Sequence, residues 1–262
     1  MLDRRADARV TGGTGGTLDG IPATALARRW GVPRCELAAS LGSTLDRAHV
    51  LGAEGVPAGT VVLALEQTAG RGRDGRTWHS PPGGLWLALL LRPRAAPLGI
   101  MSIRAGLVLA DVVDELAGRP LARLKWPNDV LVDDRKLAGV LCEGRWQGER
   151  LQWLAVGLGV NVTNEIPPAV RDTAIALRDV VPRVRLLDVI DRLIPPLVLV
   201  GAHGETLTEQ ECAAFAARDW LRDRALRGPV PGRARGVRPD GALLVEGDRE
   251  VAVVREGHVE TA

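Results

Sequence analysis

Two short stretches of the chain place fixed positive charges beside residues that bend or expose the backbone. The first is residues 67–78 (QTAGRGRDGRTW) and the second is residues 125–139 (KWPNDVLVDDRKLAG). Their principal cations are Arg71, Arg73, Arg76, Lys125 and Lys136. Arginine presents a planar fork that fits carboxylates and phosphates, and lysine presents a compact positive charge. The pairing favours a site that holds several negative charges together and away from water.

Gly70, Gly72 and Gly75 form a G-x-G-x-x-G pattern directly after the apolar run 60–66, as at the start of a dinucleotide-binding fold. That fold also needs a helix at this point and an acidic residue some way downstream. Here the chain runs into Pro-Pro-Gly-Gly at 81–84, which excludes a helix, and no acid lies where the fold requires one. We therefore predict a flexible cationic loop whose backbone can approach an anion closely. A solvated surface turn is the alternative.

The lysine segment indicates a strand, a turn and a returning strand. Pro127 holds the residue before it extended, and the following Asn-Asp pair favours a turn, so Lys125 at the strand end can point into a cleft. Lys136 lies just past a second turn, on the other strand of a predicted hairpin, so two lysines on adjacent strands can face one pocket. Asp129 could hold a divalent ion or orient a lysine. An ordinary charged hairpin in water is the alternative, which we keep for residues 133–135.

A third element is a glycine-interrupted strand predicted at 151–162. Gly157 and Gly159 lie inside its apolar run, and Asn161 follows them. Glycines inside a strand often mark a close approach of something to the backbone. Asn161 needs polar partners, for which a bound ligand and a buried structural contact are both candidates.

Length and composition narrow the class of protein. The 262 residues are 46% hydrophobic and 25% charged, which suits one large globular domain with at most a small appendage. The net charge of +2 is too weak to indicate nucleic acid or an anionic membrane as a partner. The three cysteines and four histidines lack disulfide or metal-ligand spacing, and no apolar run suits a signal peptide or a membrane span. We expect a cytoplasmic protein that binds neither DNA nor membrane.

The hydrophobic pattern predicts alternating helices and strands. Helices are expected at 23–30, from 44 to 52–55, and at 100–118, 186–200 and 208–222. Strands are expected at 35–41, 60–66, 85–91, 121–125, 130–132, 137–142 and 151–162. Pro195 and Pro196 should break or kink the fourth helix. Strands in succession with flanking helices indicate an α+β domain with a mixed or antiparallel sheet, and the turn-rich end of the chain indicates a small all-β module.

The motifs QTAGRGRDGRTW, KWPNDVLVDDRKLAG and VGLGVNV, in this order and spacing, resemble the biotin–protein ligases over residues 38–262. Lipoate ligases share the fold but not the KWPND and RKLAG pattern. The resemblance implies a flexible leader (1–20), a class II synthetase-like catalytic domain that binds biotin and ATP (21–225) and a small SH3-like C-terminal β module (226–262). It also implies the monofunctional type, because the N-terminus is too short for the DNA-binding winged-helix domain of other members.

The resemblance further implies a reaction. These enzymes join the biotin carboxylate to ATP, forming biotinyl-5′-AMP and pyrophosphate. They then transfer the biotinyl group to a lysine of a biotin carboxyl carrier protein or domain, typically that of acetyl-CoA carboxylase. The implied cofactors are ATP and Mg²⁺, with the ion held through the ATP phosphates and with Asp129 as a candidate ligand. A homodimer is an open alternative to a monomer.

Matching motifs assign residues to the two halves of such a site. The implied biotin-binding residues are Ser43, Thr44, Gln67, Gly70, Arg71, Gly72, Arg73, Lys136, Gly157 and Gly159. The implied ATP-binding residues are Arg73, Arg76, Trp78, Lys125, Asn128, Asp129 and Asn161. The implied catalytic residues are Lys136, Arg73 and Arg71, of which Lys136 contacts the biotin carboxylate and then the acyl-phosphate oxygens. The arginine loop is expected to close over the intermediate and shield it from hydrolysis.

The chain departs from the family pattern in places that bear on the site. Leu45 stands where the family usually has asparagine, so one polar contact near biotin is absent or supplied elsewhere. The C-terminal module is short at 226–232, which leaves its contribution to the site open. Two other functions remain as alternatives: a biotin-responsive regulator that binds without turnover, and a lipoate-type ligase that activates another small acid.

Overall fold

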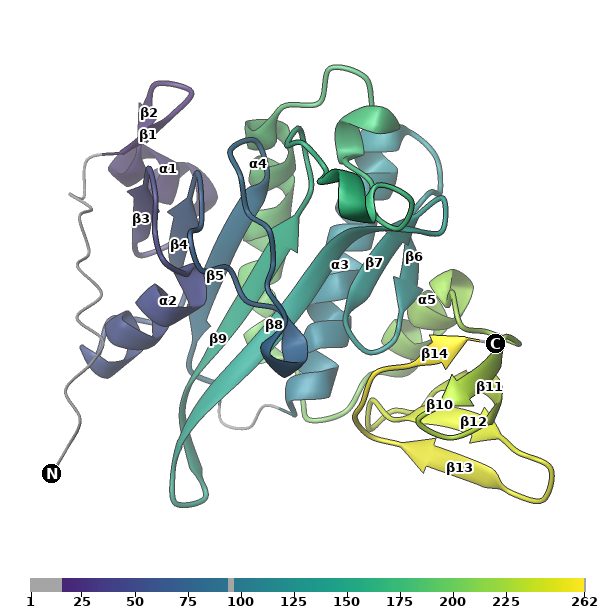
Figure 1. The fold of residues 1–262 in the computed structure, drawn as a ribbon. Coiled ribbons are helices and arrows are strands. Elements are labelled where there is room, and N and C mark those ends of the chain that lie inside the picture. The colour runs from purple at the N-terminus through teal and green to yellow at the C-terminus, as the bar shows by residue number, and fades with distance from the viewer. Residues whose placement is uncertain (1–15, 94–96, 262) are drawn as a thin grey trace, which may run out of the picture.

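The computed structural model describes residues 16–93 and 97–261, which form a seven-stranded mixed sheet and a five-stranded antiparallel sheet (Figure 1). The main sheet has the order β3 (Cys35–Ala38), β4 (Thr60–Ala64), β5 (Leu85–Leu91), β9 (Arg150–Val160), β8 (Arg135–Gln147), β7 (Asp129–Val132) and β6 (Arg123–Lys125). Strands β3 and β4 pair in parallel, and the other neighbours pair antiparallel. The predicted α+β class is confirmed.

The helices and the remaining strands surround this sheet. The helices are α1 (Ala23–Trp30), α2 (Thr44–Ala53), α3 (Leu98–Ala117), α4 (Leu186–Leu197) and α5 (Glu209–Arg218). The second sheet has the order β13 (Val251–Val254), β12 (Leu243–Glu246), β11 (Gly232–Val237), β10 (Ala225–Gly228) and β14 (Glu260–Thr261). A short hairpin joins β1 (Thr17–Leu18) to β2 (Ile21–Pro22). The part of the expected leader before residue 16 lies outside the described residues.

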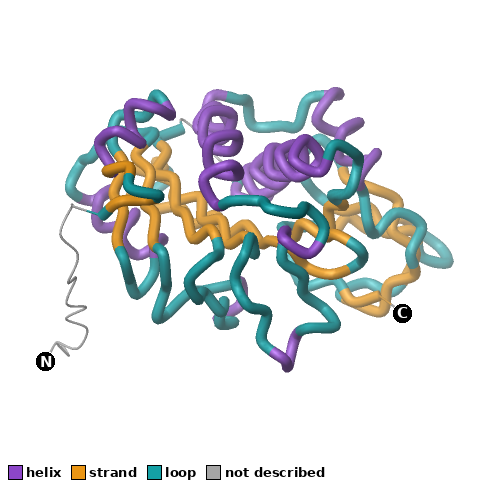
Figure 2. Tube along the Cα trace, turned by 90° about the horizontal axis from the view of Figure 1, so that it is seen from above, coloured by secondary structure: helices purple, strands orange, loops and turns teal. Residues whose placement is uncertain are grey.

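The main sheet is buried on both faces at its centre, which explains why β5 is apolar throughout. All seven residues of β5 are buried. Successive side chains of a strand point to opposite faces, so Leu87 and Leu89 join the large core cluster, whereas Ala88 and Leu90 pack in a smaller cluster with α2. Figure 2 shows the sheet as a layer with most helices on one side and long loops gathered on the other. The loop side is where the motif residues meet.

Two helix predictions need correction. Helix α4 continues through Pro195 and Pro196, so the prolines do not break it, but it ends at Leu197 and a 3₁₀ helix follows at Val198–Ala202, short of the predicted end at residue 200. The prolines lie in its last turn, and Leu193, Ile194 and Leu197 anchor it in the core. Helix α5 ends at Arg218 instead of residue 222. The chain leaves the helix there because Asp219 forms a parallel bridge to Leu124 in β6, the edge strand of the sheet.

The C-terminal sheet is held against the main sheet close to the lysine segment. The indole N–H of the buried Trp126 donates to the carbonyl of Gly241 (2.9 Å). A second link runs from the backbone N–H of Leu207 to the carbonyl of Pro239 (2.7 Å). Gly241 has a φ of +80°, and a Cβ there would lie 3.0 Å from Ile100 in α3. The close approach of the two parts therefore depends on glycine at this position.

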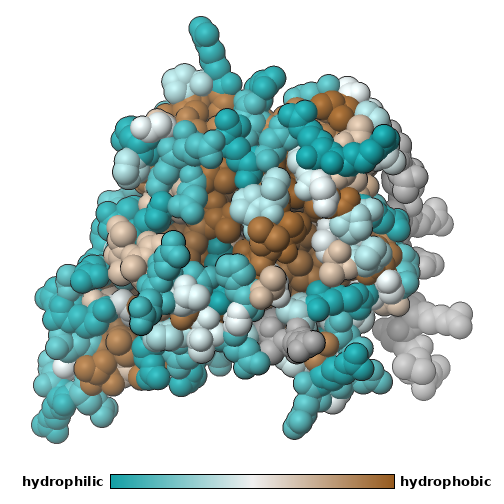
Figure 3. All heavy atoms as spheres, turned by 180° about the vertical axis from the view of Figure 1, so that it is seen from behind, coloured by the Kyte–Doolittle hydropathy of each residue, from teal (hydrophilic) through white to brown (hydrophobic). Residues whose placement is uncertain are grey.

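The face behind the sheet is polar at its border and apolar in places near its middle (Figure 3). Leu98 and Leu199 are among the large apolar side chains that are exposed in the described structure. Within residues 16–93 and 97–261, no helix combines the length and the apolar character that crossing a membrane requires.

Candidate functional site

The loop side of the sheet contains a cavity of about 370 Å³, into which both cationic motifs project. All the predicted site residues except Gly70 line its wall. Gly70 is buried beside the cavity, where a Cβ would stand 2.4 Å from the carbonyl oxygen of Trp78. The fold therefore brings together residues from separate parts of the sequence.

The arginine loop is folded as an irregular hairpin anchored at its base by Gln67. The Oε1 atom of Gln67 accepts from the N–H and the hydroxyl of Thr44 (2.8 and 3.0 Å), and its Nε2 donates to the Ser80 hydroxyl (2.9 Å). Near the tip, the N–H of Gly72 donates to the carbonyl of Arg76 (2.7 Å). Thr44 is thus tied to the loop, and Ser43 occupies the N-cap of α2 without a side-chain capping bond.

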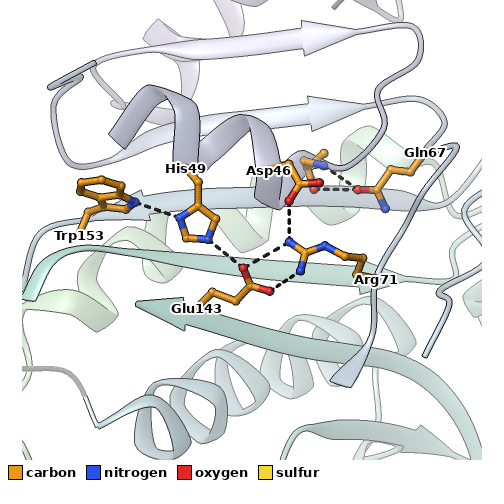
Figure 4. A network of polar contacts seen from close by, with 7 residues as sticks. Asp46, His49, Gln67, Arg71, Glu143 and Trp153 are labelled. Atoms are coloured by element: carbon orange, nitrogen blue, oxygen red, sulfur yellow. Dashed lines mark hydrogen bonds and ion pairs between the residues drawn. The ribbon is translucent and has the colours of Figure 1, made fainter. Parts of the chain in front are cut away.

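The three arginines of the loop differ in their partners. The guanidinium of Arg71 is bound by Glu143 (2.8 Å) and Asp46 (2.7 Å) (Figure 4). In the described part of the chain, no carboxylate forms an ion pair with Arg73 or Arg76. Arg73 and Arg76 are therefore available to an anion, whereas the charge of Arg71 is already balanced by the protein.

The two lysines face the same cavity, as predicted. The prediction that they lie on adjacent strands is wrong. Lys125 ends β6 and Lys136 lies on β8, with β7 between them. Lys136 Nζ lies 2.7 Å from Asp129 Oδ1 and 5.0 Å from the centre of the Trp78 ring. Oδ1 of Asp129 is buried and accepts no well-directed hydrogen bond. Its contact with Lys136 is therefore an ion pair. Asp129 orients a lysine here, one of its two predicted roles.

Lys125 is half-buried at the cavity wall. Its ammonium lies 5.2 Å from the centre of the Trp220 ring. Burial lowers the pKa of Lys125, and repulsion from Lys136, Arg224 and Arg76 adds to the effect against attraction by Asp129. An anion that enters the cavity stabilises the charged form of Lys125, because its charge compensates for the hydration that burial removed.

Asn128 and Asn161 each make a structural contact at the cavity wall. Asn128 Nδ2 donates to the carbonyl of Val140 in β8 (2.7 Å), which fixes the turn between β6 and β7. Asn161 Oδ1 accepts from the side chain of Asn164 (3.1 Å). Of the two candidates for Asn161, the structural contact is therefore present, and Asn164 itself also lines the cavity.

The close approach predicted at the glycine strand is made by protein side chains. A Cβ on Gly157 would stand 2.8 Å from Leu45, and one on Gly159 would stand 2.6 Å from Nε1 of Trp78. The Trp78 ring also reaches Gly139 on β8. Its indole Nε1 is buried and has no hydrogen-bond partner among the described residues. Leu45, which replaces the asparagine of the family pattern, thus fills the space that Gly157 leaves open.

Several lining residues had no signal in the motifs. The loop after β9 contributes Asn164, Ile166, Pro167, Val170, Thr173 and Ala174, and the C-terminal sheet contributes Gly257, His258 and Val259. Partial desolvation lowers the pKa of His258, and the nearby charges of Arg76 and Lys125 lower it further. The C-terminal module, whose contribution was left open, therefore reaches the same cavity.

The described residues contain no cluster of three or more His, Cys, Asp or Glu side chains that could hold a metal ion by themselves. Magnesium usually keeps several waters and binds through one or two carboxylates together with substrate phosphates. Two carboxylates, Asp74 and Asp129, stand on the cavity wall, and they fit a site of that kind.

The described structure is an α+β sheet whose loop face carries a half-buried lysine and two arginines without a carboxylate partner. This arrangement defines a protein that binds an anionic ligand in a partly apolar cavity. Residues 40–161 match the model of the Biotin/lipoate A/B protein ligase family. The Bifunctional ligase/repressor BirA of Bacillus subtilis is 32% identical over 240 residues, which cover 84% of this chain and 71% of that protein. The chain therefore belongs to the biotin protein ligase family.

Two further relatives agree with this assignment. The Biotin--[acetyl-CoA-carboxylase] ligase of Mycobacterium tuberculosis is 32% identical over 214 residues, covering 77% of this chain and 78% of that protein. Among solved structures, the biotin protein ligase of Aquifex aeolicus in complex with biotin and ATP has a TM-score of 0.73 and 26% identity, covering 88% of this chain and 99% of that chain.

Proposed function

We propose that the protein is an ATP-dependent biotin–protein ligase. It activates biotin as biotinyl-5′-AMP and transfers the biotinyl group to one lysine of a biotin carboxyl carrier domain, as in acetyl-CoA carboxylase. The observation that carries the proposal is the meeting of Arg73, Arg76 and Lys125 in one cavity without a carboxylate partner bonded to any of them in the described structure. The reaction takes place in the cytoplasm in this proposal.

The first step brings two anions into contact. The biotin carboxylate attacks the α-phosphorus of ATP, an O–P bond forms, and pyrophosphate leaves with the electron pair of the broken bond. Two unit charges at about 4 Å repel by roughly 4 kcal/mol at an effective dielectric constant near 20. Fixed cations offset this repulsion and stabilise the charge that develops on the phosphate. In the second step the neutral amine of the carrier lysine attacks the acyl carbon, and AMP leaves.

The residues divide between the two halves of the cavity as follows. We assign the biotin side to Ser43, Thr44, Gln67, Gly70, Arg71, Gly72, Arg73, Lys136, Gly157 and Gly159, and the ATP side to Arg73, Arg76, Trp78, Lys125, Asn128, Asp129 and Asn161. Lys136 is the strongest candidate for an essential group, because it lines the cavity and its ammonium is held there by Asp129, a residue of the proposed ATP side. Mg²⁺ accompanies the ATP phosphates, with Asp129 as a candidate ligand.

The testing experiment supplies purified protein with ATP, Mg²⁺, biotin and an apo carrier domain and then detects biotin on the carrier lysine by mass spectrometry. The wild-type protein should label the carrier, and Lys136→Ala should not. Binding of biotin without labelled carrier and without pyrophosphate release would show that the protein is a biotin-responsive regulator and not an enzyme. Preferential labelling with lipoate would show that lipoate and not biotin is the substrate.

Sedimentation of the same samples tests whether the protein forms a homodimer, which we propose as its other interaction.

A further inference from the structure

Behind the biotin side of the cavity, a chain of polar contacts runs from the core to Arg71 (Figure 4). Trp153 on β9 donates its indole N–H to Nδ1 of His49 on α2 (3.0 Å). Nε2 of His49 lies 2.9 Å from Oε2 of Glu143 on β8. Glu143 in turn accepts from both terminal nitrogens of Arg71 (2.8 and 3.3 Å). Three elements of the main fold thus converge on one side chain of the arginine loop.

The chemistry of these contacts fixes the state of each group. Because Nδ1 of His49 accepts a hydrogen bond, the ring is the neutral form with its proton on Nε2, and that proton is donated to Glu143. The hydrogen bond from His49 and the contact with Arg71 outweigh burial and hold the pKa of Glu143 at about 2. Glu143 is therefore a carboxylate at any pH at which the enzyme would work.

The base of this chain is rigid. His49 is 8% exposed. The indole of Trp153 is packed so closely on α2 that a Cβ on Gly52 would stand 2.6 Å from it. The guanidinium of Arg92 lies over the same ring, 5.9 Å from its centre. Since neither Trp153 nor His49 can turn without losing these contacts, the carboxylate of Glu143 has a set direction.

Arg71 is the member of the chain that reaches the cavity. It lines the wall, whereas Glu143, His49 and Trp153 do not. Its backbone pairs with Thr77 across the stem of the loop, and the Gly72 N–H bonds to the carbonyl of Arg76. Holding Arg71 therefore holds the stem from which Arg73 and Arg76 project.

We propose that Trp153, His49 and Glu143 are positioning residues that place the arginine loop through Arg71. Arg71 then acts as the anchor of the loop, and the free charges of Arg73 and Arg76 are directed at the anionic ligand. This inference rests on the proposed function. When Arg71 is held less firmly, water enters the cavity and biotinyl-adenylate leaves it before transfer. The positioning residues therefore determine the fraction of adenylate that reaches the carrier lysine.

The test compares Glu143→Gln and Trp153→Phe with Asp46→Asn. Glu143→Gln keeps the shape of the side chain and removes its charge, and Trp153→Phe removes one N–H donor from an otherwise apolar contact. Asp46→Asn is the matched control, because Asp46 contacts the same arginine but is 63% exposed at its side chain and belongs to no buried chain. The measured quantity is the ratio of free biotinyl-adenylate to biotinylated carrier in single-turnover reactions.

The free energy that a charge-assisted hydrogen bond contributes corresponds to about a tenfold change in an equilibrium or rate. Glu143→Gln should therefore raise this ratio about tenfold. Trp153→Phe should raise it less, and Asp46→Asn should leave it within about twofold. Arg71→Gln combined with Glu143→Gln should match the larger single effect, because both changes break one contact. Effects that multiply would show that Glu143 changes the ratio by a route other than Arg71 and would overturn the proposal. An unchanged ratio in Glu143→Gln would overturn it as well.

A second measurement needs no turnover. Trypsin cleaves after arginine, so the rate of cleavage within residues 71–76 reports how firmly the loop is held. Glu143→Gln and Trp153→Phe should be cleaved faster than wild type with melting temperatures close to that of wild type. Equal cleavage rates would refute the anchor even if the protein proved not to be a ligase. If wild type formed no adenylate while the variants were cleaved faster, the proposed function would fail and the anchor of the loop would stand.

Discussion

The ammonium of Lys136 lies 2.7 Å from Oδ1 of Asp129, across the pair of strands β7 and β8. A register shift between Val130 and Leu131 interrupts the ladder between the two residues. Because the shift re-aims side chains locally, the lysine and the aspartate come to the same face. The aspartate holds the lysine against the Trp78 ring at the centre of the cavity wall.

Replacing Asp129 should therefore impair activation through Lys136. We expect Asp129→Asn to lower kcat/KM of biotin-dependent ATP–pyrophosphate exchange by about 10–100-fold, which corresponds to roughly 1.4–2.8 kcal/mol of transition-state stabilisation. Lys136→Ala should lower it further. Asp133→Asn is the control, because Asp133 is exposed in a turn with a φ of +49°, which asparagine also tolerates. Equal loss in Asp133→Asn would contradict a specific role of the Lys136–Asp129 pair.

The arginine loop offers a second prediction. Arg73 has no carboxylate partner bonded to it among the residues described, so its removal should disturb ligand retention more than folding. Arg73→Gly should release more free biotinyl-adenylate than wild type, by about tenfold if one charge-assisted contact is lost. Labelling of unrelated proteins mixed into the reaction measures the release. If Arg73→Gly released no more adenylate than wild type, the loop would not shield the intermediate.

Sequence reasoning located the residues that carry unusual local patterns. Arg73, Arg76 and Lys125 stood out because cations beside glycine and proline have few structural uses, and the fold brings all three to the cavity. The sequence-based prediction that Lys125 and Lys136 lie on adjacent strands was wrong, because β7 separates them. A hairpin pattern indicates neighbours along the chain, but the sequence between the lysines contains two turns, and only the pairing of β6 with β7 shows which strand lies between.

The positioning residues could not have been found from the sequence. Glu143 and His49 are 94 positions apart and lie on different elements, and neither follows a turn or a glycine run. Neither stands in an unusual local pattern. Their contact exists because α2 packs on the face of the sheet formed by β4, β5 and β9, and that packing depends on a whole set of apolar side chains. His258 was missed for the same reason, since it reaches the cavity from the second sheet.

The contribution of the C-terminal module can be measured at His258. Its exposed ring lines the cavity near Lys125 and Arg76, the ATP side of our proposal. His258→Ala should raise the KM for ATP by about 3–10-fold, the range of one ordinary hydrogen bond, and leave the KM for biotin unchanged. Glu256→Gln, an exposed change two residues away, should alter neither constant. A rise in both KM values would indicate that the module had moved as a whole.

The stability of the protein should depend on pH through Asp219, which joins α5 to the C-terminal sheet. This side chain is 1% exposed, its Oδ1 accepts from the N–H of Leu221 (2.9 Å), and its Oδ2 has no partner among the described residues. Burial raises the pKa of Asp219 to about 6 from an ordinary value of 3.8. The folded state therefore binds more protons than the unfolded state between these values, and stability falls as the pH rises through this window.

Above this window the buried charge costs about 2–3 kcal/mol, because each pKa unit corresponds to about 1.4 kcal/mol. Asp219→Asn keeps an acceptor for Leu221 and removes the charge, so it should raise the free energy of unfolding at pH 7 by about 1–2 kcal/mol and leave it nearly unchanged at pH 4. Urea unfolding followed by tryptophan fluorescence measures both values.

Asp240→Asn is the control, for which the dependence of stability on pH has the opposite sign. Although burial acts against it, hydrogen bonding to Arg255 lowers the pKa of Asp240, so its contribution to stability is lost as the pH falls. A destabilised Asp219→Asn at pH 7 would show that the carboxylate is stabilised by Arg123 and Arg222 more than burial opposes it.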